Sequence, residues 1–203
     1  MNYNTILLKN ILMLLLKMSF TKEEINNFML ECFKYCQKAI ENNEVPVGCI
    51  FVHNLTKKIL YGSHNLTNKT KNANAHCEIN SIKYLEANLP YKITNDKNKE
   101  QFVYNNIQDL MSNCTLFVSC EPCIMCAYAL NLIHISKVYF GCYNDKFGGN
   151  GSIISIHKDP LWPYQSEGGF LEEKAINYLR DFYSVGNSNA PENKRQRKLK
   201  KIE

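Results

Sequence analysis

The sequence contains no apolar run long enough to cross a membrane. The run nearest the N-terminus, residues 11–16, has six residues, whereas a transmembrane helix needs about 20. No small-residue cleavage site follows it, so it does not fit a secretory signal peptide, and the absence of arginine before residue 18 argues against an organelle-targeting segment. We therefore expect no membrane partner. Residues 1–18 are predicted to be a dispensable extension or a misassigned start, because Met18 directly precedes a good helix start.

An even, regularly spaced set of cysteines is also missing. The nine cysteines are odd in number and scattered through apolar segments, which does not match the disulfide framework of a secreted domain. Apart from those assigned to a metal below, they are predicted to be reduced core residues of an intracellular protein, cytoplasmic or nuclear. Cys32 and Cys36 lie on the apolar face of the first predicted helix and are expected in the core.

Most of the chain lacks an excess of charge of either sign. The net charge is +5, but residues 191–203 alone contain six basic and two acidic residues, so the remainder is nearly neutral. A nearly neutral body binds nucleic acid weakly, which makes help from another subunit plausible. The tail, residues 187–203, is typical of a polyanion-binding arm or a nuclear localisation signal, the alternative being a solvated disordered end. The predicted RNA-binding residues are Lys194, Arg195, Arg197, Lys198, Lys200 and Lys201.

Two short segments contain residues that could bind a metal ion and transfer protons. The first contains His76 and Glu78, and the second is a Pro-Cys-x-x-Cys sequence with Cys123 and Cys126. One histidine and two cysteines can hold Zn²⁺ with three protein ligands and leave its fourth position open, as hydrolysis requires. Glu78 is expected to lie close to the metal without binding it and to move protons. This H-x-E…P-C-x-x-C pattern is the one described for zinc nucleobase deaminases.

The spacing of the second segment predicts a helix. Cys123 and Cys126 are three residues apart and would share one helix face. Pro122 suits the first position of that helix, because its missing N–H is not needed there. In a first turn, the helix dipole and the metal both favour thiolate over thiol.

Two other metal sites are compatible with the cysteines alone. Cys120, Cys123 and Cys126 resemble the start of an iron–sulfur run, but the ferredoxin pattern needs a further Cys-Pro and position 130 is leucine. A structural zinc site would need four protein ligands and no Glu78, and Cys120 could provide the fourth ligand.

The order of predicted elements indicates an α/β fold with a mixed central sheet covered by helices on both faces. Residues 88–113, rich in Asn and Lys, are predicted to be a surface insertion that is partly mobile. The predicted helices are residues 21–40, 76–85, 122–133 and 172–183, and the predicted strands are residues 47–52, 58–62, 115–119 and 137–141, with a glycine-rich loop at 147–152.

Several further segments carry a resemblance to a known family. The chain resembles the catalytic subunits of the eukaryotic heterodimeric tRNA adenosine deaminases, which convert the wobble adenosine of certain tRNAs to inosine. The resemblance extends from about residue 19 to the C-terminus. Its segments are residues 44–49, Asn65, residues 71–73, residues 121–127, residues 141–142, Asn144, residues 147–149, residues 151–152 and residues 189–191 with the basic residues after them.

The resemblance implies a three-layer α/β/α cytidine deaminase-like fold over residues 19–186. It implies Zn²⁺ on His76, Cys123 and Cys126 and Glu78 as the proton shuttle. The implied substrate-binding residues are Asn65, as a contact to the flipped nucleoside, with Val45 and Pro46. The implied partners are the tRNA anticodon arm and a related non-catalytic deaminase-fold subunit in a heterodimer. The family usually has alanine where this chain has Cys77, whose side chain is expected to point away from the metal.

The resemblance leaves two other classes of function to be compared. One is a cytidine or free-nucleoside deaminase, which would act without tRNA. The other is a non-enzymatic zinc-binding RNA module, against which the presence of Glu78 argues.

Overall fold

A five-stranded mixed sheet forms the centre of the computed structural model, which describes residues 19–185. The strand order is β2-β1-β5-β6-β7. The strands are β1 (Gly48–His53), β2 (Ile59–His64), β5 (Cys114–Cys120), β6 (Lys137–Cys142) and β7 (Gln165–Glu167). β1 is antiparallel to β2 and β5, whereas β5, β6 and β7 are parallel. The predicted mixed sheet is therefore confirmed. The predicted extension and the basic tail lie outside the described residues.

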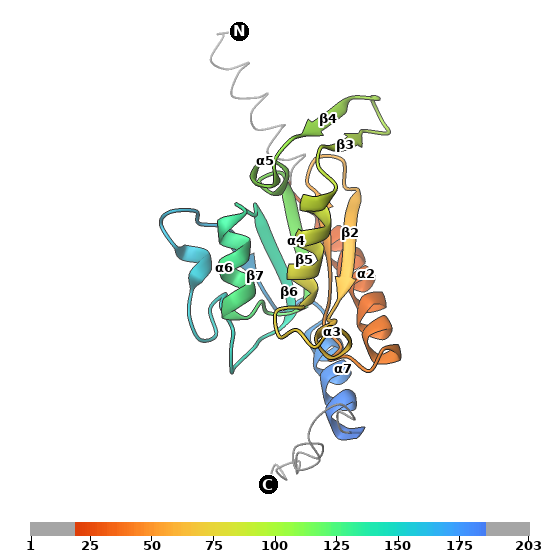
Figure 1. Cartoon of the computed structure of the whole chain (residues 1–203), viewed down its shortest axis with the longest axis vertical. Helices are drawn as coiled ribbons and strands as arrows, with labels where there is room; N and C mark the ends of the chain where they lie inside the picture. Colours follow the sequence, from red (N-terminus) through yellow and green to blue (C-terminus); the bar gives the residue numbers. More distant parts are fainter. Residues whose placement is uncertain (1–18, 186–203) are drawn as a thin grey trace.

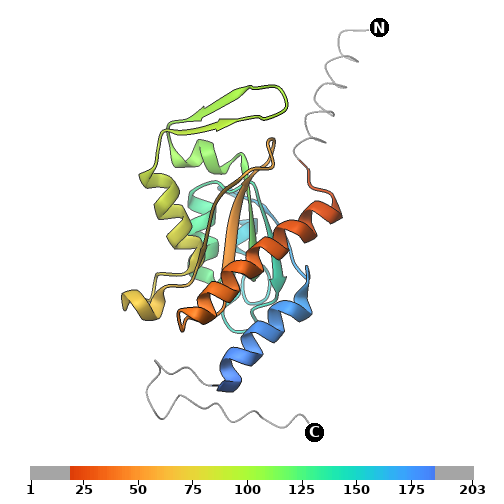
Figure 2. The ribbon, with the colours of Figure 1, turned by 90° about the vertical axis from the view of Figure 1, so that its right-hand side faces the viewer.

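Helices cover both faces of this sheet, which confirms the α/β/α layering. The helices α2 (Lys22–Glu41) and α7 (Glu172–Val185) lie on one face, and α4 (Cys77–Ala87) and α6 (Ile124–Leu132) lie on the other (Figures 1 and 2). No helix between residues 19 and 185 is long and apolar enough to cross a membrane.

The central strands supply side chains to both layers because successive residues of a strand point to opposite faces. Phe51 packs in the cluster that contains Leu85 of α4, whereas its neighbour Ile50 packs with Met29 of α2. Each such side chain contributes about 1.5–3 kcal/mol to the free energy of unfolding when it is fully buried. The core is thus continuous through the sheet.

Helix α2 begins as its sequence predicts. The Thr21 side chain accepts a hydrogen bond from the Glu24 backbone N–H (3.1 Å), and the Glu24 carboxylate accepts one from the Thr21 N–H (2.8 Å). This capping box satisfies two N–H groups that the helix itself leaves unpaired. Cys32 and Cys36 are fully buried on its inner face, so their predicted core position is confirmed.

Residues 88–113, the predicted surface insertion, contain regular secondary structure that the sequence did not predict. They form a hairpin, β3 (Tyr91–Thr94) with β4 (Gln101–Tyr104), followed by helix α5 (Ile107–Met111), at the top of Figure 1. The apolar residues scattered among the Asn and Lys residues join the core cluster on the α4 side of the sheet. The buried ones are Ile93, Ile107, Leu110 and Met111.

A buried histidine connects this hairpin to the central sheet. His53 lies at the end of β1, and its Nε2 is 2.8 Å from the Tyr104 hydroxyl while its Nδ1 is 2.9 Å from the Thr56 hydroxyl. Burial lowers the pKa of His53 to about 4, with a further contribution from Lys57. The imidazole is therefore neutral at pH 7, so one ring nitrogen donates and the other accepts.

Candidate active site

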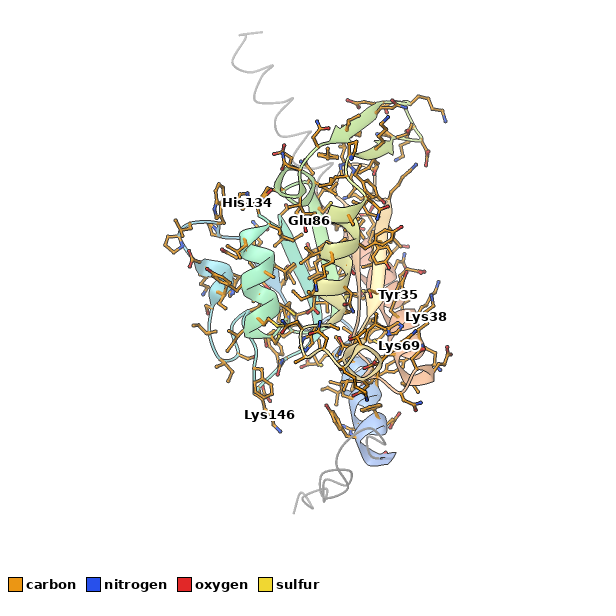
Figure 3. All side chains as sticks on the ribbon, in the orientation of Figure 1. Tyr35, Lys38, Lys69, Glu86, His134 and Lys146 are labelled. Carbon is orange, nitrogen blue, oxygen red and sulfur yellow. The ribbon has the colours of Figure 1, made fainter. Side chains whose placement is uncertain are left out.

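The two predicted metal-binding segments meet at the starts of two helices. His76 is the N-cap residue of α4 and Cys123 is the N-cap residue of α6. Both helices lie on the same face of the sheet (Figure 1). The site lies away from the C-terminal end of α4: Glu86 near that end and Lys146, which lines the pocket at the site, are far apart in Figure 3. Residues distant in sequence are thus brought together by two adjacent helix starts.

Pro122 was predicted to be the first residue of the helix, but it lies two positions before that residue. Cys123 has extended backbone angles (φ −66°, ψ 166°) as the N-cap, so the helix begins at Ile124 and Pro122 precedes it. A backbone bridge between Cys123 and Gly148 keeps this stretch extended. Cys126 then lies in the first turn, and both sulfurs still face His76.

The three ligand atoms fit a zinc ion. The Sγ atoms of Cys123 and Cys126 are each 3.5 Å from His76 Nδ1, and all three atoms lie within 4.8 Å of one another. Tetrahedral zinc, with Zn–S near 2.3 Å and Zn–N near 2.05 Å, would separate sulfur from nitrogen by about 3.6 Å. The donor set and its spacing therefore match the zinc site that the sequence predicts.

Cys120 is outside this cluster. In the described part of the chain, the group that could hold a metal consists of His76, Cys123 and Cys126 alone. The Cys120 thiol instead pairs with Cys142, its neighbour in β6, and this hydrogen bond raises the pKa of Cys120 well above its usual value. Residues 19–185 thus provide no fourth cysteine ligand at the site, which disfavours both the structural zinc and the iron–sulfur alternatives.

The environment of the cluster favours a thiolate. A hydrogen bond from Cys126 lowers the pKa of Cys123 to about 4, and His76 lowers it further against the opposing effect of burial. The hydrogen bond to Cys123 in turn raises the pKa of His76. A thiolate is the form of cysteine that binds metals.

Glu78 lies next to the cluster in the first turn of α4 and is 3% exposed. Burial raises the pKa of its carboxyl, and the negative charge of Cys123 raises it further. A raised pKa brings a carboxyl closer to the operating pH of a general acid–base group.

Cys77 is not part of the metal-binding group, but it contacts the predicted proton shuttle. It is fully buried, and its Sγ donates a hydrogen bond to Glu78 Oε2 (3.2 Å). The family resemblance gave no reason to expect this contact.

A pocket of about 480 Å³ opens beside the cluster. Of the predicted substrate-binding residues, Val45 and Asn65 line it, whereas Pro46 is buried and does not. The Asn65 Oδ1 accepts a hydrogen bond from the Cys77 backbone N–H (3.0 Å). The predicted basic residues of the tail lie outside the described part of the chain.

Two further walls of the pocket were not predicted. The loop after β6 contributes Tyr143, Asn144, Asp145, Lys146 and Phe147, and α7 contributes Leu179 and Tyr183. The short helix α3 (Thr67–Thr70) follows Asn65. The buried carboxylate of Glu44 accepts hydrogen bonds from the backbone N–H groups of Asn68 (3.0 Å) and Lys69 (2.8 Å). Glu44 follows the polar residues Glu41, Asn42 and Asn43, so no sequence pattern indicated this role.

Comparison with known proteins gives the same assignment as the geometry. Residues 22–142 match the cytidine and deoxycytidylate deaminase zinc-binding region. The tRNA-specific adenosine deaminase 2 of Xenopus laevis is 38% identical over 180 residues, covering 87% of this chain and 95% of the relative. The tRNA-specific adenosine deaminase subunit tad2 of Schizosaccharomyces pombe is 33% identical over 180 residues, covering 86% of this chain and 41% of the longer relative.

A solved structure shares the fold. It comes from biochemical and structural studies of A-to-I editing by tRNA:A34 deaminases at the wobble position of transfer RNA. It superposes with a TM-score of 0.59 at 24% identity, covering 75% of this chain and 99% of that chain. The chain therefore belongs to the cytidine and deoxycytidylate deaminase zinc-binding family, in which its relatives are tRNA-specific adenosine deaminases.

Proposed function

We propose that this protein deaminates the wobble adenosine of tRNA to inosine and that it is the catalytic subunit of a heterodimer. The observation that carries the proposal is the three-ligand cluster with buried Glu78 beside it, in a chain that is 38% identical to a tRNA-specific adenosine deaminase 2. A three-ligand site leaves one zinc position for water or substrate.

His76, Cys123 and Cys126 would hold the ion. Bound zinc lowers the pKa of water to about 7 and so supplies a nucleophile at neutral pH. Glu78 takes the proton that the attacking water releases and delivers it to the adenine ring nitrogen as C6 is attacked. It then carries a second proton to the leaving amine. Adenosine and water thus give inosine and ammonia.

The pocket fits a base that has left its stack. Its volume of about 480 Å³ lies within the range of small-molecule sites. Asn65 Nδ2 would donate a hydrogen bond to the nucleoside, and Val45 would contact its apolar faces. An anticodon loop presents an unpaired base, which reduces the unstacking cost of a few kcal/mol.

The heterodimer is supported by an apolar face on α6. Ile124, Tyr128 and Leu132 are four residues apart and are 42%, 54% and 52% exposed. Spacing by four puts them on one side of the helix, and burial against a second subunit would remove this apolar surface from water. The Schizosaccharomyces pombe relative is itself called a subunit.

The decisive assay measures inosine at the anticodon of an adenosine-starting tRNA. We expect turnover when this chain is combined with its related partner subunit and little with either chain alone. Turnover of free cytidine without tRNA would instead assign the chain to nucleoside deamination. Zinc and tRNA binding without deamination of either substrate would indicate a non-enzymatic RNA-binding module.

Removal of residues 191–203 is expected to weaken tRNA binding. The deletion takes away six basic residues, and each lost phosphate contact lowers the slope of log K against log salt by about one unit. Binding of labelled tRNA would be measured over a salt series for the full chain and the deletion. An unchanged slope would exclude the tail as an RNA-binding segment, whereas normal turnover of saturating tRNA would show that the fold is intact.

A further inference from the structure

Glu121 is a buried carboxylate that the mechanism does not use. It immediately precedes the Pro-Cys-x-x-Cys segment, is 2% exposed, and is neither in the metal-binding group nor in an ion pair within residues 19–185. Burying a charge without hydrogen bonds or a counterion is costly. Hydrogen-bond donors are therefore needed around the Glu121 carboxylate.

Four hydrogen bonds converge on this carboxylate from one loop. Oε1 accepts from the backbone N–H groups of Asn150 (2.9 Å) and Ser152 (3.1 Å). Oε2 accepts from the Asn144 N–H (2.9 Å) and from the Ser152 hydroxyl. All four donors belong to residues 144–152, which wrap around the carboxylate.

The loop approaches so closely that a side chain at Gly148 would displace this carboxylate. A Cβ added at Gly148 would lie 2.5 Å from Glu121 Oε2 and 2.6 Å from its Cδ. Backbone bonds also tie the loop to the start of α6, because the Phe147 carbonyl accepts from the Ile124 N–H (2.8 Å) and the Gly149 N–H donates to the Pro122 carbonyl (2.8 Å).

The same loop forms one wall of the pocket. Tyr143, Asn144 and Lys146 line it together with Val45 and Asn65, which come from earlier in the sequence. The loop contains no regular helix or strand between β6 and η1 (Ile156–Lys158) in the described structure. The hydrogen bonds from this loop to Glu121 and to the start of α6 therefore help to hold the loop in its conformation.

We infer that Glu121 is a positioning residue: its carboxylate gathers the donors of residues 144–152 and so shapes the pocket wall that contacts the RNA. This inference rests on the proposed function for the identity of the substrate. Glu121 itself takes no part in proton transfer or metal binding.

An amide cannot replace this carboxylate. Each carboxylate oxygen accepts two hydrogen bonds, so Glu121→Gln puts an NH₂ group against at least one backbone N–H in either amide orientation. Ser152→Ala is the matched control, because it removes one hydroxyl donor and keeps the three backbone bonds. Gly148→Ala disturbs the same contact from the loop side and leaves the carboxylate unchanged.

The test compares these three variants in the heterodimer with tRNA as substrate. We expect Glu121→Gln and Gly148→Ala to raise KM about tenfold, with kcat changed less than about threefold and zinc content unchanged. Ser152→Ala should stay within about twofold of the unmodified protein. A normal KM with a reduced kcat in Glu121→Gln, or loss of zinc, would overturn the inference.

A second measurement does not depend on activity. Lys146 is exposed in the loop, so trypsin cleavage after it reports opening of the loop. We expect cleavage after Lys146 to be about tenfold faster in Glu121→Gln and Gly148→Ala than in Ser152→Ala. Equal rates of cleavage after Lys146 in the three variants would contradict the inference. Global unfolding of both Glu121→Gln and Gly148→Ala would also contradict it. If the unmodified protein forms no inosine but the cleavage rates differ as expected, the proposed function fails and the positioning role remains.

Discussion

Replacing Glu78 by alanine is expected to abolish inosine formation while the protein keeps its zinc. General acid–base catalysis contributes about 10²–10⁴-fold, and Glu78 is the buried carboxylate beside the three-ligand cluster. We therefore expect kcat to fall by about 10³-fold or more. Zinc content is measured by elemental analysis, and turnover is measured by inosine in the anticodon.

The matched control is Glu86→Ala on the same helix. Glu86 is exposed near the C-terminal end of α4, does not line the pocket and lies far from the pocket residue Lys146 (Figure 3), so this variant should retain full turnover. If Glu78→Ala lost its zinc, Glu78 would be a ligand or a structural support of the site and not a proton shuttle. If it retained activity, another group would have to move the protons.

Cys126→Ala is expected to lose both the metal and turnover. Two ligands remain in this variant, His76 and Cys123, whereas catalytic zinc sites use three. We expect zinc to fall from one per chain to well below that value and kcat to become unmeasurable. The thermal midpoint should also fall, because a metal ion that binds the folded protein stabilises it.

Cys120→Ala separates the two metal models. Its thiol pairs with Cys142 and lies outside the metal-binding group, so we expect this variant to keep one zinc per chain. Loss of zinc in Cys120→Ala would restore the four-ligand structural site as the correct description.

Long, strongly patterned elements of the fold were predictable from sequence. Helix α2 has both its capping box and its apolar periodicity, and β5 and β6 each have a buried apolar centre, residues 116–118 and 138–140. The hairpin of β3 and β4 was missed because each strand has only four residues. A pattern this short, among Asn and Lys residues, gives no clear period.

The site was predictable only where residues close together in the sequence determine its geometry. His76 and Glu78 share one segment, as do Cys123 and Cys126, and their residue types define the donor set. The prediction that Pro122 is the first residue of helix α6 was wrong. The helix begins after Cys123, whose extended backbone pairs with Gly148 in a tertiary contact. The role of Glu121 depends on a loop more than 20 residues away in sequence, which local patterns do not encode.

The ligands of this site also make it a reversible cross-link. His76 and Cys123 are 47 residues apart, so an ion that binds both closes a loop containing α4, the hairpin of β3 and β4, α5 and β5. A covalent closure of this length would restrict the unfolded chain by about 4 kcal/mol. Loss of the ion would release a quarter of the chain from that restraint, so the supply of zinc would govern the lifetime of the protein as well as its chemistry.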